Sequence, residues 1–275
     1  MFRYLDYIII NSLLVFLAHS LQDSGDELSK SGTKEWNGST NSRFFTYVVA
    51  ISSSENIDAV HCSGSLISKD YILTAAHCFI DKNTNSISKE KFLVHSPFSV
   101  DNQISEISVI TTHSNFSLHD GINDIAVAKL STSLPLLNEY DYAKIYTDVP
   151  VSGNEVVVAG KGLSEISSNN ILSTRYFSSS ISDSSKCKYK FCSTCLCYPV
   201  YNDKSTCLGD SGAPVTVDTP HFNHLIGVFS FTISPKPNLE CGLDGDVDYF
   251  TSLTLYTEWI SNNTNIQPEN LISTK

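Results

Sequence analysis

Short apolar runs of strand length dominate the chain from Phe44 onward. The runs are rich in β-branched and aromatic residues, and clusters of serine, asparagine and glycine separate them. The clearest runs are FTYVVAI, YILTAA, EISVITTH, DIAVAKL, EVVVAG and HLIGVFSF. Many short strands between turn residues are typical of β-barrels and β-sandwiches. We therefore expect an all-β fold.

The length of the chain, 275 residues, allows one large domain or two closely packed lobes. A polar break around residues 148–154 is the expected boundary between two β lobes. The lobes would cover roughly residues 44–145 and 150–253.

The C-terminal region departs from the strand pattern. Leu253–Ser261 is the one stretch that has a helical pattern, and we expect Leu255, Trp259 and Ile260 to face a core. Residues 266–275 are expected to form a mobile tail.

The first 20 residues have the features of a signal peptide. An apolar run covers residues 7–18, and the small residues Ala18 and Ser20 predict cleavage after Ser20. An uncleaved membrane anchor is the alternative, although the run is short for a membrane span. Residues 21–34 are polar and form the expected leader, a candidate propeptide.

Two further features agree with secretion. Asn37, Asn115 and Asn262 each begin an N-x-S/T triplet, so they are candidate glycosylation sites. The eight cysteines are an even number, as expected for disulfides formed in an oxidising compartment. The crowded cysteines from Cys187 to Cys207 could also form a zinc cluster, but thiolate ligands are mainly an intracellular device. We expect a secreted, extracellular glycoprotein with disulfides and no metal.

The charge of the chain excludes several classes of partner. The net charge is −11 and the pI is about 5.1. Nucleic acids and anionic membranes both select basic surfaces, so neither is an expected partner. No glycine-rich phosphate loop follows a predicted strand, and we expect no cofactor. The expected oligomeric state is a monomer.

Three motifs bring together the residue types of nucleophilic catalysis. YILTAAHCF contains His77, NDIAVAKL contains Asp124, and GDSGAPV contains Ser211. A serine hydroxyl is a poor nucleophile until a base removes its proton, and a carboxylate must orient that base. Each residue alone has a structural explanation, as a core histidine, a turn aspartate or a loop serine. Together they predict a Ser-His-Asp triad.

The motifs TAAHC, NDIAVAKL and CLGDSGAPV resemble the three signature motifs of the trypsin-like serine proteases, which have the chymotrypsin fold. The resemblance runs from about Glu35 to Ile260, and the implied protease domain covers residues 35–265. It implies two packed antiparallel six-stranded β-barrels, a C-terminal helix, and a catalytic site in the cleft between the barrels.

The resemblance also assigns catalytic roles. Ser211 would attack the scissile carbonyl, His77 would take and return the proton, and Asp124 would orient His77. The backbone N–H groups of Gly209 and Ser211 would form the oxyanion hole, and a glycine at 209 suits a backbone that turns its N–H inward.

Disulfide pairs are implied in the same way. Cys62–Cys78 beside the histidine and Cys207–Cys241 at the specificity pocket match bridges of the family. The four remaining cysteines allow three connectivities. The family has one bridge in this region, which Cys187–Cys197 resembles best, and Cys192–Cys195 would then be an additional local pair.

The primary specificity pocket is expected at three places. Ser205 lies at the base, where trypsins have aspartate, and Ser230-Phe231-Thr232 resembles the strand that pairs with substrate. Thr232 replaces the usual glycine and should narrow the mouth of the pocket. Asp248 on the far wall could receive an arginine or lysine side chain, because a buried carboxylate needs a cation. If Asp248 instead lies at the surface, a small or medium apolar residue is expected.

Asp210 raises the question of activation. In the family, the residue before the serine is neutralised by a new N-terminal ammonium that forms when the zymogen is cleaved. Here Glu35 occupies the place of the aliphatic first residue, and Asn37 starts a glycosylation triplet. Either another group satisfies Asp210, or the chain stays in a zymogen-like state.

The function that we expect is that of a secreted serine endopeptidase that prefers arginine or lysine at the cleaved position. Its partners would be protein or peptide substrates and protein inhibitors. The alternative is a non-catalytic homologue that binds a partner protein, which Glu35, Thr232 and Ala213 would favour. A transferase or esterase with the same acyl-enzyme chemistry is a third interpretation.

Overall fold

The computed structural model describes most of the chain beyond its N-terminal segment. The described residues are 44–100, 104–148, 150–162, 173–183, 185, 187, 192–200, 204–217, 223–235, 241–243 and 245–273. The predicted signal peptide, the leader, Glu35 and Asn37 lie outside these residues.

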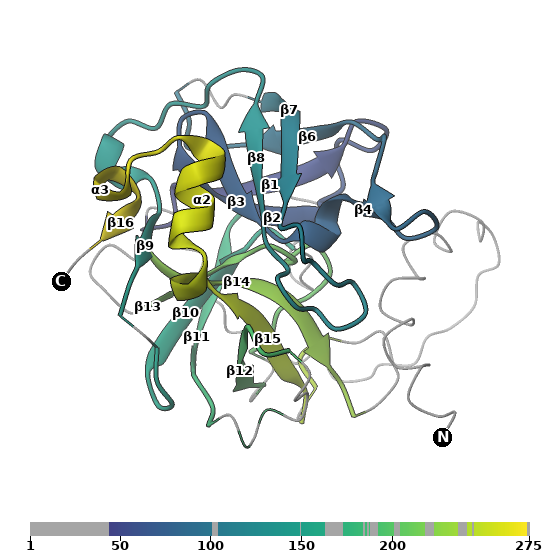
Figure 1. Ribbon diagram of the computed structural model, residues 1–275, viewed down its shortest axis with the longest axis vertical. Coiled ribbons are helices and arrows are strands. Elements are labelled where there is room, and N and C mark those ends of the chain that lie inside the picture. Colours follow the sequence, from purple (N-terminus) through teal and green to yellow (C-terminus); the bar gives the residue numbers. More distant parts are fainter. Residues whose placement is uncertain are drawn as a thin grey trace, which may run out of the picture.

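The first lobe is a closed barrel of six strands (Figure 1). The strands are β1 (Val48–Ser53), β2 (Cys62–Ser68), β3 (Tyr71–Thr74), β6 (Phe92–His95), β7 (Ile104–Thr112) and β8 (Ala126–Leu130). Their order around the barrel is β1-β2-β3-β8-β7-β6, and the paired strands are antiparallel. Closure of the barrel removes exposed strand edges.

The second lobe is a curled antiparallel sheet below the barrel in Figure 1. Its main strands are β10 (Glu155–Gly160), β11 (Arg175–Ser180), β12 (Cys195–Pro199), β13 (Pro214–Val217), β14 (His224–Ile233) and β15 (Val247–Ser252). They follow the order β11-β10-β13-β14-β15-β12. The two end strands approach each other, since the Ser182 N–H just after β11 donates to the Cys197 carbonyl in β12 at 2.9 Å. The predicted all-β, two-lobe fold is confirmed, with the second lobe curled rather than closed.

Smaller elements connect the two lobes and extend them. The remaining strands are β4 (Ile80–Asp81), β5 (Ser86–Ile87), β9 (Lys144–Tyr146) and β16 (Ile272–Ser273). The helical elements are η3 (Ala76–Phe79), η4 (Glu139–Asp141), η5 (Leu253–Leu255), α2 (Thr257–Thr264) and α3 (Pro268–Leu271). No helix among the described residues is long and apolar enough to cross a membrane.

A hydrophobic core joins the lobes. The largest buried cluster contains barrel residues such as Leu66 and Ile72 together with Val157 and Val228 of the second sheet. Burial of this surface from both lobes fixes their relative position, because interiors pack densely and resist sliding. The loops that leave the two lobes at this contact therefore meet in a defined geometry.

The C-terminal region differs from the prediction in two respects. Ile260 is buried as expected and Trp259 is half-buried, but Leu255 is 62% exposed because it ends the short helix η5 before α2 begins. The expected mobile tail is also wrong for the residues described. Leu271 in α3 is buried, and β16 pairs in parallel with β9. Leu271 and Ile272 are the apolar residues that allow this tail to pack against the rest of the protein.

Candidate active site

His77 lies on the short helix η3, directly after β3 of the barrel. Its Nδ1 is 2.7 Å from Oδ2 of Asp124, and its backbone N–H donates to Oδ1 of Asp124 at 2.9 Å. A carboxylate acceptor at Nδ1 places the proton of the neutral imidazole there, so Nε2 is left as the basic nitrogen. This is the arrangement that a general base requires.

Asp124 precedes β8 and is almost completely buried, with 2% of its side chain exposed. The Ser230 hydroxyl donates to its carboxylate, and the Thr251 hydroxyl donates to its backbone carbonyl at 3.0 Å. Burial opposes ionisation of Asp124, but the interactions with His77 and Ser230 prevail and lower its pKa below the usual range. Asp124 is thus a charged group held by both lobes. Ser230, predicted to bind substrate, is here a partner of the aspartate.

Ser211 lies in the turn between β12 and β13 that follows Cys207. Its carbonyl accepts from the Ser63 N–H at 2.7 Å, and Sγ of Cys78 is 3.8 Å from the same oxygen. The next residue, Gly212, has φ +82°, and a Cβ there would lie 2.0 Å from the Thr74 hydroxyl. Only glycine permits this approach, which puts the serine turn against the end of β3, just before His77.

The third interaction of a triad would join the Ser211 hydroxyl to the His77 imidazole. Within the described part of the chain, the Ser211 hydroxyl makes no hydrogen bond with the imidazole. Catalytic hydrogen bonds in structures without substrate are often long and tighten only in the complex. The structure nevertheless brings the three triad candidates to one place between the lobes.

Gly209 adopts φ +90°, which is strained for any residue with a side chain. A Cβ on it would lie 2.9 Å from the Gly162 Cα. Among the described residues, the N–H groups of Gly209 and Ser211 have no hydrogen-bond acceptor. Two nearby backbone donors without a partner are the feature that an oxyanion hole needs.

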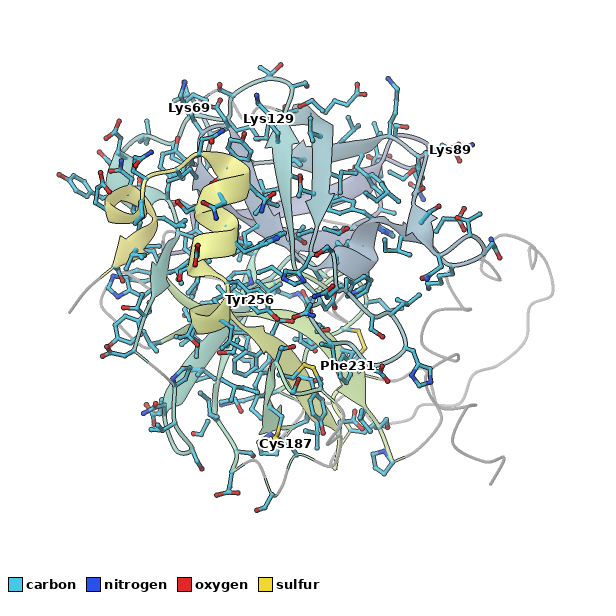
Figure 2. The ribbon with its side chains drawn as sticks, viewed as in Figure 1. Lys69, Lys89, Lys129, Cys187, Phe231 and Tyr256 are labelled. Atoms are coloured by element: carbon cyan, nitrogen blue, oxygen red, sulfur yellow. A yellow bond between two sulfur atoms is a disulfide. The ribbon has the colours of Figure 1, made fainter. Side chains whose placement is uncertain are left out.

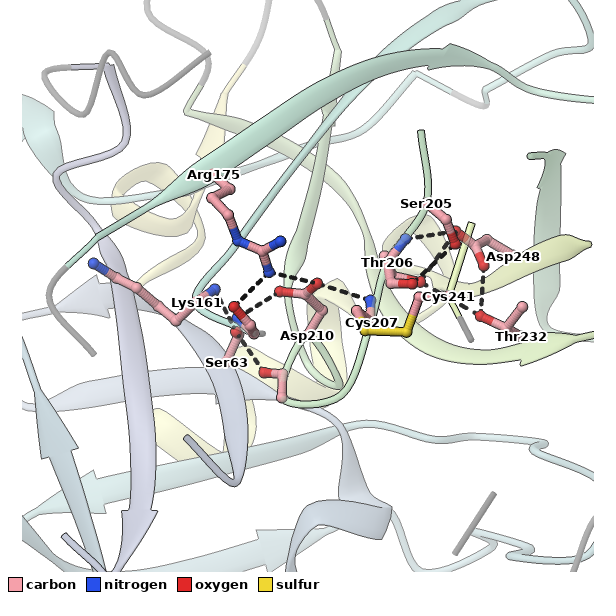
Figure 3. Close-up of polar contacts among 12 residues, drawn as sticks. Ser63, Lys161, Arg175, Ser205, Thr206, Cys207, Asp210, Thr232, Cys241 and Asp248 are labelled. Carbon is pink, nitrogen blue, oxygen red and sulfur yellow. Dashed lines mark hydrogen bonds and ion pairs between the residues drawn. A yellow bond between two sulfur atoms is a disulfide. The ribbon is translucent and has the colours of Figure 1, made fainter. Parts of the chain in front are cut away.

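The Asp210 side chain lies in a buried polar cluster (Figure 3). Its carboxylate accepts from the Gly162 N–H at 2.7 Å and the Cys207 N–H at 2.9 Å. The guanidinium of Arg175 is 3.4 Å from the same carboxylate, and both side chains are at most 7% exposed. Burial raises the pKa of Asp210, and Arg175 and the two N–H groups oppose this shift.

Sequence reasoning missed Arg175. The sequence left open that a group other than the N-terminus neutralises Asp210. It did not indicate which of the 18 lysines and arginines that group is. The pairing depends on the ladder that places Arg175 opposite Gly160, so only the strand register reveals it.

Ser205, Thr232 and Asp248 lie together in the second lobe, where the hydroxyls of Ser205 and Thr232 contact the Asp248 carboxylate (Figure 3). The Thr232 hydroxyl donates to Asp248 at 2.5 Å, and that of Ser205 is 3.5 Å away. Thr206 donates to the same carboxylate from its N–H at 3.1 Å and its hydroxyl at 3.0 Å. Asp248 is fully buried, which rules out the surface position, and burial raises its pKa to about 6 against these hydrogen bonds.

Phe231 precedes Thr232 in β14 and pairs with Tyr249 of β15. Its ring stacks on Tyr249 with centroids 4.9 Å apart, and Phe231 lies in the lower lobe (Figure 2). Gly121 also lies against this ring, since a Cβ at its φ of +65° would lie 2.4 Å from Cε1 of Phe231. The aromatic surface is therefore bounded by a loop from the first lobe.

All four predicted disulfides are present, namely Cys62–Cys78, Cys187–Cys197, Cys192–Cys195 and Cys207–Cys241. None of the described cysteines is free, so the alternative zinc cluster has no thiolate to use. Cys62, Cys78 and His77 are close enough to hold a metal, but their sulfurs are bonded to each other. Asn115 and Asn262 are exposed, as an acceptor of a glycan must be.

Comparison with known proteins agrees with this geometry. The model of the trypsin family, described as "Trypsin", matches residues 36–260. Trypsin alpha of Drosophila erecta is 28% identical over 204 residues, which cover 71% of this chain and 77% of that protein. Kallikrein-4 of Homo sapiens is 28% identical over 210 residues, covering 72% and 76%. Trypsin I-P1 of Gallus gallus is 27% identical over 206 residues, covering 72% and 77%. The chain belongs to the trypsin family of serine proteases.

Proposed function

We propose that the protein is a secreted endopeptidase that hydrolyses peptide bonds through a Ser-His-Asp acyl-enzyme mechanism. The observation that carries the proposal is the bond between His77 Nδ1 and the buried, ionised Asp124. This hydrogen bond fixes the tautomer of His77 and leaves Nε2 as the nitrogen that can accept the proton of Ser211. The predicted signal peptide, the three N-x-S/T triplets and the disulfides support secretion.

The reaction follows from these positions. Ser211 Oγ attacks the peptide carbonyl carbon while its proton passes to His77 Nε2, and the carbonyl oxygen becomes an oxyanion beside the N–H groups of Gly209 and Ser211. His77 then gives the proton to the leaving amine, and the acyl group stays on Ser211. A water molecule, deprotonated by His77, attacks the ester and releases the acid.

Asp248 supports a preference for arginine or lysine at the cleaved position. It is a buried carboxylate beside Ser205 and Thr232, and none of the lysine, arginine or histidine side chains described forms an ion pair with it. An incoming cation would therefore find an unneutralised anion in the pocket. Thr232 stands where the family usually has glycine and would narrow the mouth of the pocket, so a small or medium apolar residue is the competing outcome.

Cleavage of a peptide library tests both levels of the proposal. We expect cuts after arginine and lysine by the wild type, no cuts by Ser211→Ala, and loss of the basic preference in Asp248→Ala. Cuts after small residues that persist in Asp248→Ala would contradict the preference for arginine and lysine but not the peptidase activity. No cuts by any form of the secreted protein, under conditions in which it is folded, would instead favour the non-catalytic binding protein.

A further inference from the structure

Asp210 connects two segments that are far apart in the sequence. Its carboxylate binds the backbone N–H of Gly162, after β10, and that of Cys207, at the start of the Ser211 turn. A second link joins the same segments, because the Ser63 hydroxyl donates to the Gly209 carbonyl at 2.9 Å and accepts from the Lys161 N–H at 3.0 Å. The position of the Ser211 turn thus depends on the charge state and orientation of Asp210.

The Asp210 carboxylate occupies the space that side chains at positions 160 and 162 would otherwise fill. A Cβ on Gly160 would lie 2.1 Å from Oδ1 of Asp210, and one on Gly162 would lie 2.7 Å from its Cγ. Both distances are far inside van der Waals contact. The two glycines therefore form the cradle into which Asp210 turns.

The guanidinium of Arg175 places a positive charge beside the Asp210 carboxylate. Arg175 is the first residue of β11, and its Nη2 donates both to the Gly162 carbonyl and toward Oδ2 of Asp210 (Figure 3). The neighbouring Lys161 points away from Asp210 in the same view, with its Nζ 6.0 Å from the Phe98 ring centroid. Among the described residues, Arg175 is thus the cation that pairs with Asp210.

We propose that Arg175 is a positioning residue for catalysis, which holds the Ser211 turn and its oxyanion donors in place through Asp210. A buried carboxylate requires a compensating cation, and here the cation comes from β11 instead of a newly cut N-terminus. A terminus that starts at Glu35 would add a second carboxylate to this cluster, which an internal arginine avoids. The turn is consequently ordered in the uncut chain, and activity requires no cleavage near Lys34. This inference rests on the proposed peptidase function.

The test uses three variants of the chain that begins at residue 21. Arg175→Met removes the charge with similar bulk, and Arg175→Lys retains the charge but loses the planar fork. Lys161→Met is the matched control, because it removes a buried cation of the same cluster that does not contact Asp210. Hydrogen exchange at the Gly162 and Cys207 amides reports the cluster without any catalysis. The rate at which a fluorophosphonate labels Ser211 reports the oxyanion hole.

We expect the uncut wild type and Lys161→Met to be labelled at similar rates. Arg175→Met should lose on the order of 10²-fold in labelling rate, as for loss of an oxyanion donor, and its two amides should exchange roughly tenfold faster or more. Arg175→Lys should recover part of both losses, and it keeps the test informative if Arg175→Met does not fold.

Two results would overturn the inference. One is a wild type that is labelled only after cleavage near Lys34, and the other is an Arg175→Met variant that keeps wild-type labelling and exchange. Failure of the proposed function is distinguishable from both. In that case no form is labelled, even after cleavage, while loss of amide protection in Arg175→Met still supports the positioning role.

Discussion

Asp210 and Asp248 are two buried carboxylates of the second lobe, but their surroundings differ. Asp210 has a guanidinium and two backbone N–H groups, whereas Asp248 has three hydroxyls, one N–H and no cation among the described residues. The first is neutralised within the protein, and the second is left for a ligand to neutralise. The difference separates a structural carboxylate from a recognition carboxylate, although both are aspartates at less than 10% exposure.

The largest effect on stability is expected for Asp210→Asn. The amide leaves the buried Arg175 without an anion, and its NH2 group faces backbone donors that it cannot bond. Removal of one partner of a buried ion pair typically costs about 3–5 kcal/mol. The measurement is urea unfolding at pH 7.5, and a loss below about 1 kcal/mol would show that Arg175 and Asp210 are not coupled.

Asp248→Asn is the matched substitution, and it should cost less than about 1 kcal/mol at the same pH. The hydroxyls around residue 248 can rotate to donate or accept, so they can satisfy an amide as well as a carboxylate. Cleavage after arginine and lysine should nevertheless fall sharply. A cost as large as that of Asp210→Asn would break the distinction between the two carboxylates.

The pH dependence of stability should also distinguish Asp248. Its pKa is raised by burial from 3.8 to about 6, so the native state binds the proton more tightly than the unfolded chain does. Stability from this group is present below pH 3.8 and is lost as the pH rises through 6, by about 3 kcal/mol in total. The difference in unfolding free energy between the wild type and Asp248→Asn, measured from pH 4 to pH 7, should change by an amount of this order. A difference that does not vary with pH would contradict the assigned environment.

The smallest effect concerns Thr232, whose hydroxyl donates to Asp248. Thr232→Val removes a hydrogen bond that favours the ionised carboxylate, so the pKa of Asp248 should rise further. The loss of activity on arginine substrates at acidic pH should then begin at a higher pH than in the wild type. Thr232→Ser, which keeps the hydroxyl, is the control and should retain the wild-type profile.

Much of this structure could be predicted because motifs with fixed local roles determine it. The motifs around His77 and Asp124 predicted two side chains that form a hydrogen bond, and the short apolar runs between turn residues predicted the strands. The environments of Asp210 and Asp248 could not be predicted to the same degree. Arg175 reaches Asp210 only through the β10–β11 register, and burial of Asp248 depends on its pairing opposite Thr232 across β14 and β15.

The prediction of a mobile C-terminal tail was wrong for a related reason. The tail's place at the C-terminus suggested mobility, but Leu271 is buried and β16 pairs with β9. Tertiary contacts between segments more than 100 residues apart decide such cases, and local sequence carries little information on them.

The most direct test of the central claim is labelling of the secreted wild-type protein with a fluorophosphonate, followed by mass spectrometry to locate the adduct. The reagent needs an activated serine and a formed oxyanion hole, so it tests the triad and the Ser211 turn together. We predict a single adduct on Ser211 that is absent from His77→Ala. A folded wild-type protein without this adduct, cut or uncut, would contradict the assignment of the site as catalytic.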